Sequence, residues 1–331
     1  MAENNLLEIT NLSTGFHIDG KFYNAIEGIN LSVKEKEVVC IVGESGCGKS
    51  VLSLSIMHLL PKHNGEISGG DIVFDGHELS KLSEAEMNKL RGKDLAMIFQ
   101  EPMTALNPVF TIGSQLQEAL FNHTDMSKES ARERCVELLK NVGISRPERI
   151  MDEYPHQLSG GMRQRVMIAM AIALHPKLLI ADEPTTAVDV TVQAQILELL
   201  KEIQEQEKMA ILFITHDLGV VAEIADRVVV MYAGQIVEEG SVDKIFYDAQ
   251  HPYTKALLSS IPRLDEEKEE LNTIKGIVPP LTKLSHTSCR FADRCPVRMD
   301  KCMTEQPELV EISPGHRSRC LLNYPAGKVE V

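Results

Sequence analysis

Short, wholly apolar runs recur along the chain at residues 38–42, 178–181, 210–214 and 228–231, with stretches of helical spacing between them. Apolar runs of this length are typical of strands that are buried on both faces of a parallel sheet. The alternation of such strands with helical stretches predicts an α/β domain built of βαβ units.

Other parts of the chain follow different patterns. Apolar and polar positions alternate around residues 7–12 and 29–33, which is typical of strands with one exposed face, so we expect a partly exposed sheet there. Between about residues 100 and 165 the pattern changes to helices separated by Pro and Gly, which indicates a helical insert.

The end of the chain is set apart by a charge run, DEEKEE at residues 265–270, which we interpret as a solvated linker or the start of a helix. It opens a distinct extension that contains prolines. The predicted organisation is a nucleotide-binding domain over residues 1–260, with its helical part at about 101–165, and a C-terminal extension over residues 261–331.

Composition narrows the possible functions. The chain has 331 residues, of which 43% are hydrophobic and 25% charged, as in an ordinary globular protein. We find neither a bilayer-length apolar stretch nor a leader sequence at the start, so we expect a cytoplasmic protein. The net charge of −14, without a local basic patch, argues against nucleic acid and anionic lipid as partners. A membrane role would then depend on a protein partner.

A glycine-rich loop, GESGCGKS at residues 43–50, follows the apolar run 38–42 and precedes helical spacing over residues 49–60. Strand, loop and helix is the order of a phosphate-binding loop, in which backbone N–H groups face phosphates at a helix N-terminus. Lys49 would neutralise phosphate charge, and the Ser50 hydroxyl would contact Mg²⁺. This motif alone indicates only a nucleotide site.

Two acidic residues, Asp182 and Glu183, end the apolar run at residues 178–181. Carboxylates hold Mg²⁺ in phosphoryl-transfer sites, so we expect Asp182 to bind the metal through water. Glu183 is expected to polarise the attacking water as a general base. Alternatively, Asp182 and Glu183 could be surface acids at the end of a strand, but the presence of the phosphate loop argues against this interpretation.

The segment LSGGMRQ at residues 158–164 closely resembles the signature sequence of ATP-binding cassette (ABC) ATPases. Ser159, Gly160 and Gly161 lie at a helix start and offer hydroxyl and N–H donors to a γ-phosphate. The resemblance implies that this phosphate belongs to the opposite subunit, so that two cassettes enclose two ATP molecules. It also implies a P-loop NTPase fold with a parallel-sheet core, an antiparallel β subdomain and a helical subdomain.

Other positions that this family uses are also filled. The resemblance assigns Gln100 to the metal and the attacking water, and His216 to the γ-phosphate. It assigns residues 186–189 to a loop that crosses the dimer interface, where the family more often has leucine in place of Val188.

The aromatic residue that stacks on adenine is expected to be Phe16, with Tyr23 as the alternative, although either could belong to the core. The expected catalytic residues are Glu183, His216 and Gln100, and the expected Mg²⁺ ligands are Ser50, Gln100 and Asp182. The expected ATP contacts are Phe16, Gly43, Glu44, Ser45, Gly46, Cys47, Gly48, Lys49, Ser50, Val51, Gln100, Asp182, Ser159, Gly160 and Gly161.

Three longer strings, at residues 97–108, 154–166 and 251–258, resemble the D-type ATPase subunits of dipeptide and oligopeptide permeases. The likeness covers essentially the whole chain. It implies a peripheral ATPase at the cytoplasmic face of the cell membrane, working with two permease subunits and an extracytoplasmic peptide-binding protein. The second cassette would be an F-type ATPase or a second copy of this chain.

Related functions remain open at this point. Nickel, glutathione or antimicrobial-peptide import is possible, because solute choice resides mainly in the binding protein and the permease. A soluble cassette ATPase is less favoured, since the chain has neither the long coiled coils of repair-type members nor a fused second cassette.

Four of the seven cysteines gather in the C-terminal extension and form a candidate ligand set: Cys289, Cys295, Cys302 and Cys320. Their arrangement resembles the extension that carries a [4Fe-4S] cluster in some peptide-permease ATPases, and that cluster is the preferred cofactor besides ATP and Mg²⁺. Four thiolates can hold it, but the spacing differs from the usual ferredoxin runs. A zinc site, which favours closer pairs of cysteines, and free thiols remain alternatives.

Overall fold

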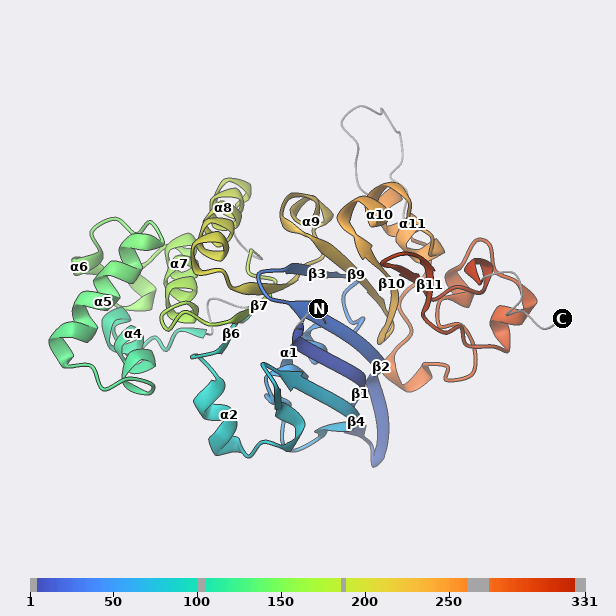
Figure 1. The fold of residues 1–331 in the computed structure, drawn as a ribbon, viewed down its shortest axis with the longest axis horizontal. Coiled ribbons are helices and arrows are strands. Elements are labelled where there is room, and N and C mark those ends of the chain that lie inside the picture. Colours follow the sequence, from blue (N-terminus) through green and yellow to red (C-terminus); the bar gives the residue numbers. More distant parts are fainter. Residues whose placement is uncertain (1–4, 101–104, 186–188, 261–273, 325–331) are drawn as a thin grey trace. The chain divides into compact units, whose positions relative to one another are not determined.

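The computed structural model describes residues 5–100, 105–185, 189–260 and 274–324 (Figure 1). The chain forms two compact units. The first unit comprises residues 1–6, 33–37 and 81–213. The second comprises residues 7–32, 38–80 and 214–331. Both units combine helices with β-strands, which confirms the α/β class predicted from the sequence.

The sheet of the first unit contains β6 (Leu95–Ile98), β7 (Leu178–Asp182) and most of β8 (Ala210–Ile214), in the order β8-β7-β6. Strands β6 and β7 pair in parallel, from Leu95 opposite Leu178 to Ile98 opposite Ala181. Every residue of β7 and β8 is buried, as expected where a parallel sheet is covered on both faces. The strands predicted at residues 178–181 and 210–214 are therefore confirmed.

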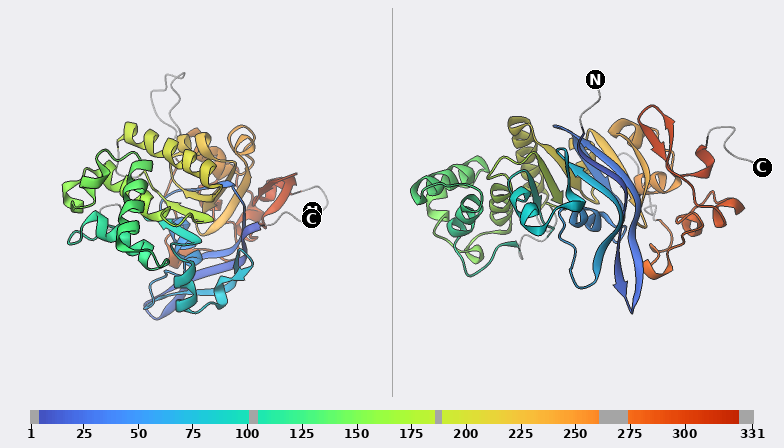
Figure 2. Two further views of the ribbon diagram at one scale, coloured as in Figure 1. Left: turned by 60° about the vertical axis from the view of Figure 1, so that its left-hand side comes forward. Right: turned by 60° about the horizontal axis from the view of Figure 1, so that its bottom comes forward.

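Helices make up most of the rest of the first unit, and four of them pack together between residues 112 and 171. In both views of Figure 2 they form one group, drawn in green. Thr111, Ser127 and Ser159 cap three of these helices, each accepting a hydrogen bond from a backbone N–H three residues later. The helices of this unit are α2 (Glu84–Leu90), α4 (Ile112–Phe121), α5 (Lys128–Asn141), α6 (Pro147–Ile150), α7 (Gly160–Ala171) and α8 (Val190–Glu207), with a 3-10 turn at Pro155–Gln157.

The second unit contains a four-stranded sheet in the order β2-β1-β4-β5. Strand β4 (Gly65–Phe74) runs antiparallel to both β1 (Asn5–Ile18) and β5 (His77–Glu78), and β2 (Lys21–Lys34) lies on the other side of β1. Buried and exposed positions are mixed along β1 and β2, which confirms the partly exposed sheet predicted from the alternating pattern.

A second sheet of this unit has the strand order β11-β12-β10-β9-β3. Strands β3 (Val38–Val42) and β9 (Arg227–Tyr232) pair in parallel and are the strands predicted from the apolar runs. Strand β10 (Gln235–Ser241) runs antiparallel to β9. The helices of this unit are α1 (Lys49–Ile56), α9 (Leu218–Ile224), α10 (Val242–Tyr247) and α11 (Pro252–Ser259).

Helix α1 is shorter than the sequence predicts. The apolar spacing suggests a helix up to residue 60, but α1 ends at Ile56. His58 adopts a left-handed backbone conformation, with a φ of 52°, which a right-handed helix cannot accommodate. The prediction of the helix end is therefore wrong by one turn.

The C-terminal segment, residues 274–324, contains two strands that the sequence pattern does not predict. Strand β12 (His316–Ser318) runs antiparallel to both β10 and β11 (Val310–Ser313), with Ser318 opposite Glu238. The remaining regular structure is a set of 3-10 turns at Leu281–Lys283, Ala292–Arg294, Asp300–Met303 and Leu321–Asn323. The predicted linker at residues 265–270 lies outside the described residues.

The described part of the chain contains no helix that is both long enough and apolar enough to cross a bilayer.

Candidate functional site

The glycine-rich loop joins β3 to α1 in the second unit, as predicted. Gly43 has a φ of 153°, and a Cβ atom there would lie 2.2 Å from the backbone oxygen of Met231. Gly48 has a φ of 106°, and a Cβ atom there would lie 2.6 Å from Cγ2 of Ile26. A side chain at either position would be strained and would collide with its neighbour, so these two glycines fix the path of the loop.

Lys49, the first residue of α1, points back into this loop. Its side chain is buried, and Nζ donates to the backbone oxygens of Gly43 at 2.8 Å and Glu44 at 3.3 Å. An ammonium group is thus held by two carbonyl oxygens in a loop that is followed by a helix N-terminus. An anion that enters the loop meets this charge. Ser50, half-buried, follows in the first turn of α1.

The predicted catalytic carboxylates lie at the end of β7 in the first unit. Asp182 is the last residue of the strand and is buried. Glu183 follows with a φ of 48°, a left-handed conformation that is uncommon for residues other than glycine and is concentrated at functional sites. The amide nitrogen of Gln100 donates to Oε2 of Glu183 at 3.0 Å. Two residues that the sequence separates by 83 positions are therefore brought together.

The signature segment begins α7 in the same unit. Ser159 caps the helix, since its hydroxyl accepts from the N–H of Met162 at 3.3 Å. Ser159 and Gly160 are exposed, and a Cβ atom built on Gly160 would meet nothing within 4 Å. At Gly161 a Cβ atom would lie 2.9 Å from Val192, so this glycine lets α7 approach α8 closely. The segment therefore presents an exposed backbone at a helix N-terminus.

Helix α7 is also hydrogen-bonded to the segment that follows β7. The side-chain amide of Gln164 is buried and donates to the backbone oxygen of Pro184 at 2.5 Å. Pro184 directly follows Glu183, so this hydrogen bond links α7 to the backbone next to the predicted general base.

His216 lies in the second unit, just after β8, and is exposed. The next residue, Asp217, caps α9 by accepting from the N–H of Gly219 at 2.9 Å. Phe16 and Tyr23 are both half-buried in the four-stranded sheet, so the choice of adenine partner stays a prediction. Residues 186–188 of the predicted interface loop, and residues 101–104 after Gln100, lie outside the described residues.

The predicted ATP contacts thus divide between the two units. Gln100, Asp182, Glu183 and the signature residues belong to the first, and Phe16, residues 43–51 and His216 to the second. Within the described ranges, no three His, Cys, Asp or Glu side chains are placed to hold one metal ion.

The four cysteines of the C-terminal segment line one small, enclosed cavity of about 20 Å³. The cavity presents only apolar surface, and Phe291 and Leu321 contribute to its wall. Burial raises the pKa of the thiols of Cys289, Cys295 and Cys320, that of Cys320 to about 11, and the neighbouring cysteines raise these pKa values further. Metal binding at this cavity must therefore displace protons.

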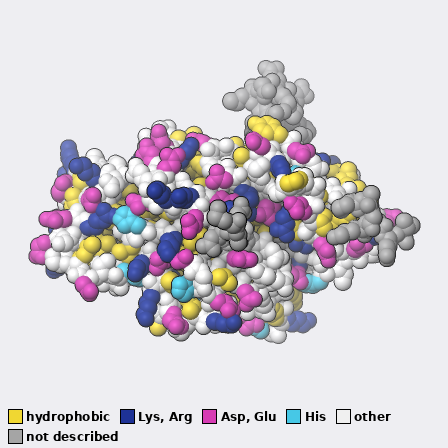
Figure 3. All heavy atoms as spheres, in the orientation of Figure 1, with side chains coloured by type: hydrophobic (Ala, Val, Ile, Leu, Met, Phe, Trp, Pro, Cys, Tyr) yellow, Lys and Arg dark blue, Asp and Glu magenta, His cyan; other side chains and the backbone are white. Residues whose placement is uncertain are grey.

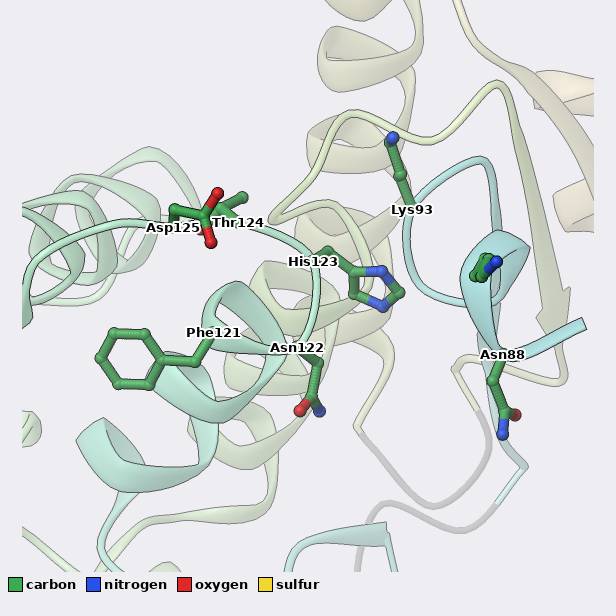
Figure 4. A pocket seen from close by; sticks show the side chains of 8 residues that line it. Asn88, Lys93, Phe121, Asn122, His123, Thr124 and Asp125 are labelled. Atoms are coloured by element: carbon green, nitrogen blue, oxygen red, sulfur yellow. The ribbon is translucent and has the colours of Figure 1, made fainter. Parts of the chain in front are cut away.

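Another hollow lies in the first unit, between α2 and the end of α4 (Figure 4). It has a volume of about 490 Å³, and its wall includes Lys93 and His123. None of the residues predicted for the ATP site lines it. On the face drawn in Figure 3, Lys and Arg side chains are interspersed with Asp and Glu among the described residues.

Comparisons with known proteins identify the family. Residues 26–186 match a profile described as ABC transporter, and residues 237–302 match one described as oligopeptide/dipeptide transporter, C-terminal region. The oligopeptide transport ATP-binding protein AppD of Bacillus subtilis strain 168 is 54% identical over 97% of this chain and 98% of its own length. The chain belongs to the ABC transporter ATP-binding proteins. The dipeptide transport ATP-binding protein DppD of Escherichia coli K12 is 49% identical, with 97% of each chain covered.

Solved structures agree with this ABC assignment. The ATP-binding cassette MJ0796, in a dimeric post-hydrolysis state bound to ADP and Pi, is 30% identical, with a TM-score of 0.64 over 71% of this chain and 98% of its own. The cassette cbiO1 from Clostridium perfringens is 28% identical, with a TM-score of 0.63 over 74% of this chain and 92% of its own. The cassette fold and the assignment as an ATP-binding ATPase, both predicted from the sequence, are thereby confirmed.

Two residues without a predicted role contact the phosphate loop. The Tyr253 hydroxyl accepts from the N–H of Glu44 at 2.9 Å, and Arg294 forms an ion pair with the Glu44 carboxylate. Tyr253 belongs to a string that supports the family resemblance, which was its only signal in the sequence. Arg294 carried no signal in the sequence apart from its position next to Cys295.

Proposed function

We propose that this chain is the ATP-hydrolysing subunit of an importer of dipeptides or oligopeptides. The observation that carries the proposal is the match of residues 237–302 to the C-terminal region of oligopeptide/dipeptide transporters, because that region distinguishes peptide transporters from cassettes in general. The names of relatives that are 49–54% identical over nearly the whole chain support the same class of solute.

ATP binds, in this proposal, to the loop at residues 43–51 of the second unit. The buried Lys49 ammonium exchanges its carbonyl partners for phosphate oxygens, which is favourable because a phosphate brings the negative charge that a carbonyl lacks. Phe16 stacks on the adenine ring. The assignment of the loop rests on its fixed glycines and on the N-terminus of α1 that follows it.

Hydrolysis uses the residues at the end of β7 together with Gln100 and His216. Ser50, Gln100 and Asp182 offer hydroxyl, amide and carboxylate oxygens, the ligand types that suit Mg²⁺, which would neutralise charge on the β- and γ-phosphates.

Glu183 takes a proton from the attacking water, and His216 donates to the γ-phosphate. The hydrogen bond from Gln100 to Glu183 supports this arrangement, because it orients the carboxylate that acts as base.

A second cassette completes the site. Ser159, Gly160 and Gly161 contact the γ-phosphate of ATP that is bound to the partner cassette. The exposure of Ser159 and Gly160 at the start of α7 supports this role, since a contact to another subunit needs free surface. The partner is an F-type ATPase or a second copy of this chain. Purification of the assembled transporter and identification of its cassettes by mass distinguishes these two arrangements.

Two permease subunits receive the motion of the cassettes. The proposed contact is the helical part near Gln100 and residues 105–108, whose neighbours Phe99, Val109 and Phe110 expose 43%, 70% and 54% of their surface. Apolar side chains that are exposed side by side in the sequence favour contact with another protein. The chain then acts at the cytoplasmic face of the membrane, and an extracytoplasmic binding protein delivers the peptide.

The four C-terminal cysteines hold a [4Fe-4S] cluster in this proposal. All four line one cavity with apolar walls, which supports this proposal because four thiolates are the ligand set of such a cluster. A zinc ion with four sulfur ligands at about 2.3 Å is the alternative.

The cluster is tested by anaerobic purification with iron and sulfide analysis. We expect about four iron and four sulfide per chain, with loss of both in Cys302→Ser. The matched control is Cys135→Ser, a buried cysteine of α5 in the other unit, which should leave the iron content unchanged. A colourless, iron-free protein that binds zinc stoichiometrically would contradict the cluster.

The catalytic assignment is tested with Glu183→Gln. The variant should bind ATP as the unchanged protein does and lose more than about 99% of turnover, because the amide cannot accept the proton of the attacking water. Glu202→Gln, an exposed change on α8, is the matched control and should leave the rate unchanged. Full activity in Glu183→Gln would disprove the role of Glu183.

The solute class is tested in cells. Deletion of the chain should abolish uptake of a labelled dipeptide or oligopeptide, and the Glu183→Gln chain should fail to restore it. Unchanged uptake of both classes of peptide after the deletion would disprove the proposed solute.

A further inference from the structure

Glu44, the second residue of the phosphate loop, is held at each of its polar groups. Its N–H donates to the hydroxyl of Tyr253 at 2.9 Å, and its backbone oxygen accepts from the N–H of Cys47 at 3.2 Å and from Lys49. Its carboxylate forms a two-bond pair with Arg294, at 2.7 Å and 2.9 Å. Two of these contacts come from far along the chain, 209 and 250 residues away.

Arg294 is fixed as firmly as its partner. Its side chain is only 5% exposed. The guanidinium lies over the ring of Tyr232, with 5.7 Å between Cζ and the ring centre, and its Nε donates to the backbone oxygen of Lys275 at 2.9 Å. A planar guanidinium with two parallel bonds to a carboxylate sets direction as well as distance, which the single ammonium of a lysine does not.

Tyr253 links the loop to the C-terminal segment by packing. It is fully buried. The centre of its ring lies 4.7 Å from the ring centre of Tyr232 and 5.4 Å from that of Phe291. Phe291 also belongs to the wall of the cavity that the four cysteines line. Arg294 directly precedes one of those cysteines, Cys295. Tyr253 is therefore linked to this cavity through Phe291, and Arg294 through the adjacent Cys295.

We propose that Arg294 and Tyr253 are positioning residues of the phosphate loop, through which the C-terminal segment sets the affinity of this ATPase for nucleotide. The proposal rests on the proposed ATP site at residues 43–51. It concerns residues outside that site, and it gives the C-terminal region a part in the chemistry of the cassette.

The physical reason has two parts. The pair with Arg294 holds Glu44, and with it the start of the loop whose N–H groups must face the phosphates. The guanidinium also balances the negative charge of Glu44, which would otherwise act on a triphosphate bound to the same loop. Loss of Arg294 therefore loosens the loop and adds repulsion, and removal of the Glu44 charge should reverse the second effect.

The experiment measures the Kd for Mg-ATP of the full chain and the KM and kcat of the assembled transporter. Arg294→Ala should raise Kd and KM about tenfold, or about 1.4 kcal/mol, while kcat stays within about twofold. Combination with Glu44→Gln should recover most of this loss, as a double-mutant cycle reports. Arg298→Ala is the matched control, because Arg298 is half-exposed and its carboxylate contact, with Asp293, is long at 3.9 Å.

Tyr253→Phe tests the second contact with minimal change in packing. It removes only the hydroxyl that accepts from Glu44, and should raise Kd about threefold. Tyr247→Phe is the control, since Tyr247 is 89% exposed.

The outcomes separate this inference from the proposed function. If Lys49→Ala abolishes ATP binding but Arg294→Ala leaves Kd unchanged, the inference alone is overturned. If Lys49→Ala binds ATP normally, the proposed ATP site itself is wrong. Loss of kcat in Arg294→Ala without recovery by Glu44→Gln would reduce Arg294 to a general structural role and would also overturn the inference.

Discussion

The helical segment at residues 112–171 and the C-terminal segment at residues 274–324 are built on different principles. The helices satisfy most of their backbone groups internally, α4, α5 and α7 begin at Ser or Thr caps, and apolar side chains such as Leu116 and Leu138 are buried. The C-terminal segment has only short strands and 3-10 turns, so much of its backbone needs partners from elsewhere.

Arginine side chains of the segment supply some of those partners. Arg290 donates to the backbone oxygen of Ser285 and Arg319 to that of Pro307, each at 3.1 Å. The same two side chains also bind backbone oxygens outside the segment, those of Ala233 at 2.6 Å and Ile236 at 2.8 Å. Burial lowers the pKa of both guanidinium groups, yet each keeps its charge at neutral pH because hydrogen bonds replace water. The C-terminal segment, which has a small apolar cluster, thus depends on specific polar contacts. The helical segment depends on the burial of apolar side chains.

The loss of one buried carboxylate, that of Glu238, should destabilise the C-terminal region strongly. Glu238 is fully buried and accepts from the N–H of Gln250 at 2.6 Å, the N–H of His251 at 2.9 Å and the ring of His316 at 2.8 Å. Glu238→Ala leaves these donors without their acceptor and should cost about 3–5 kcal/mol. Urea denaturation followed by circular dichroism measures the change.

Glu205→Ala on the exposed face of α8 is the control and should change stability by less than about 0.5 kcal/mol. A Glu238→Ala protein as stable as this control would contradict the dependence of the C-terminal region on polar contacts.

Loss of apolar volume should be the corresponding weakness of the helical segment. Leu116 in α4 is fully buried, and Leu116→Ala should cost about 2–4 kcal/mol through the cavity that it leaves. Phe121→Ala, on the same helix but 42% exposed, should cost less than half as much. Equal losses from the two changes, measured by the same denaturation, would contradict a core centred on Leu116.

Acid should weaken the second unit through His251. Burial, and secondarily the charge of Arg319, lower the pKa of this histidine to about 3, although a hydrogen bond to the Arg319 backbone opposes the shift. In the unfolded chain this histidine has its ordinary pKa near 6.5, so the unfolded chain binds the extra proton as pH falls from about 6.5 toward 3. Stability is therefore full above pH 6.5 and should fall by about 1.4 kcal/mol per pH unit below it.

His251→Asn keeps an acceptor for the N–H of Tyr253 and removes the titration. Between pH 6.5 and 5.0 this variant should lose about 2 kcal/mol less stability than the unchanged protein. Identical pH dependence of the two melting temperatures would rule out His251 as the source.

A helix cap should give the smallest effect. The hydroxyl of Ser127 accepts from the N–H of Ser130 at 3.2 Å at the start of α5, and Ser127→Ala should cost about 1 kcal/mol. Ser145→Ala, at an exposed position before α6, is the matched control with no expected change. A loss in Ser127→Ala as large as in Leu116→Ala would contradict this contrast, because the helical segment would then depend on a polar contact as much as on burial.

The sequence predicts the elements that carry their own pattern. The apolar runs at residues 38–42, 178–181, 210–214 and 228–231 become buried strands because such runs have few other uses in a soluble domain. Strands β11 and β12 could not be predicted, since they lack such a run and form by pairing with β10. The end of α1 was missed because the turn at His58 leaves no signature in the apolar spacing.

The residues of the site likewise include some that sequence motifs predict and others that only the folded chain brings together. The glycine-rich loop and the strand-end carboxylates are visible as motifs, because local backbone geometry dictates the residue types there. The contact between Gln100 and Glu183 needs the sheet to bring distant strands together. Tyr253 and Arg294 escaped detection because their partner, Glu44, lies more than 200 residues away. The roles of the individual site residues stay predictions.

Strand β12 also has a consequence for solubility. It pairs with one side of β10 at Glu238 and Glu239, while β9 occupies the other side, so the middle of β10 is paired on both sides. The outer strand of the sheet is instead β11, which has four residues and carries Glu311. Short, charged outer strands resist pairing with other molecules. Truncation before residue 274 would uncover the seven-residue edge of β10 and give copies of the protein a template for aggregation.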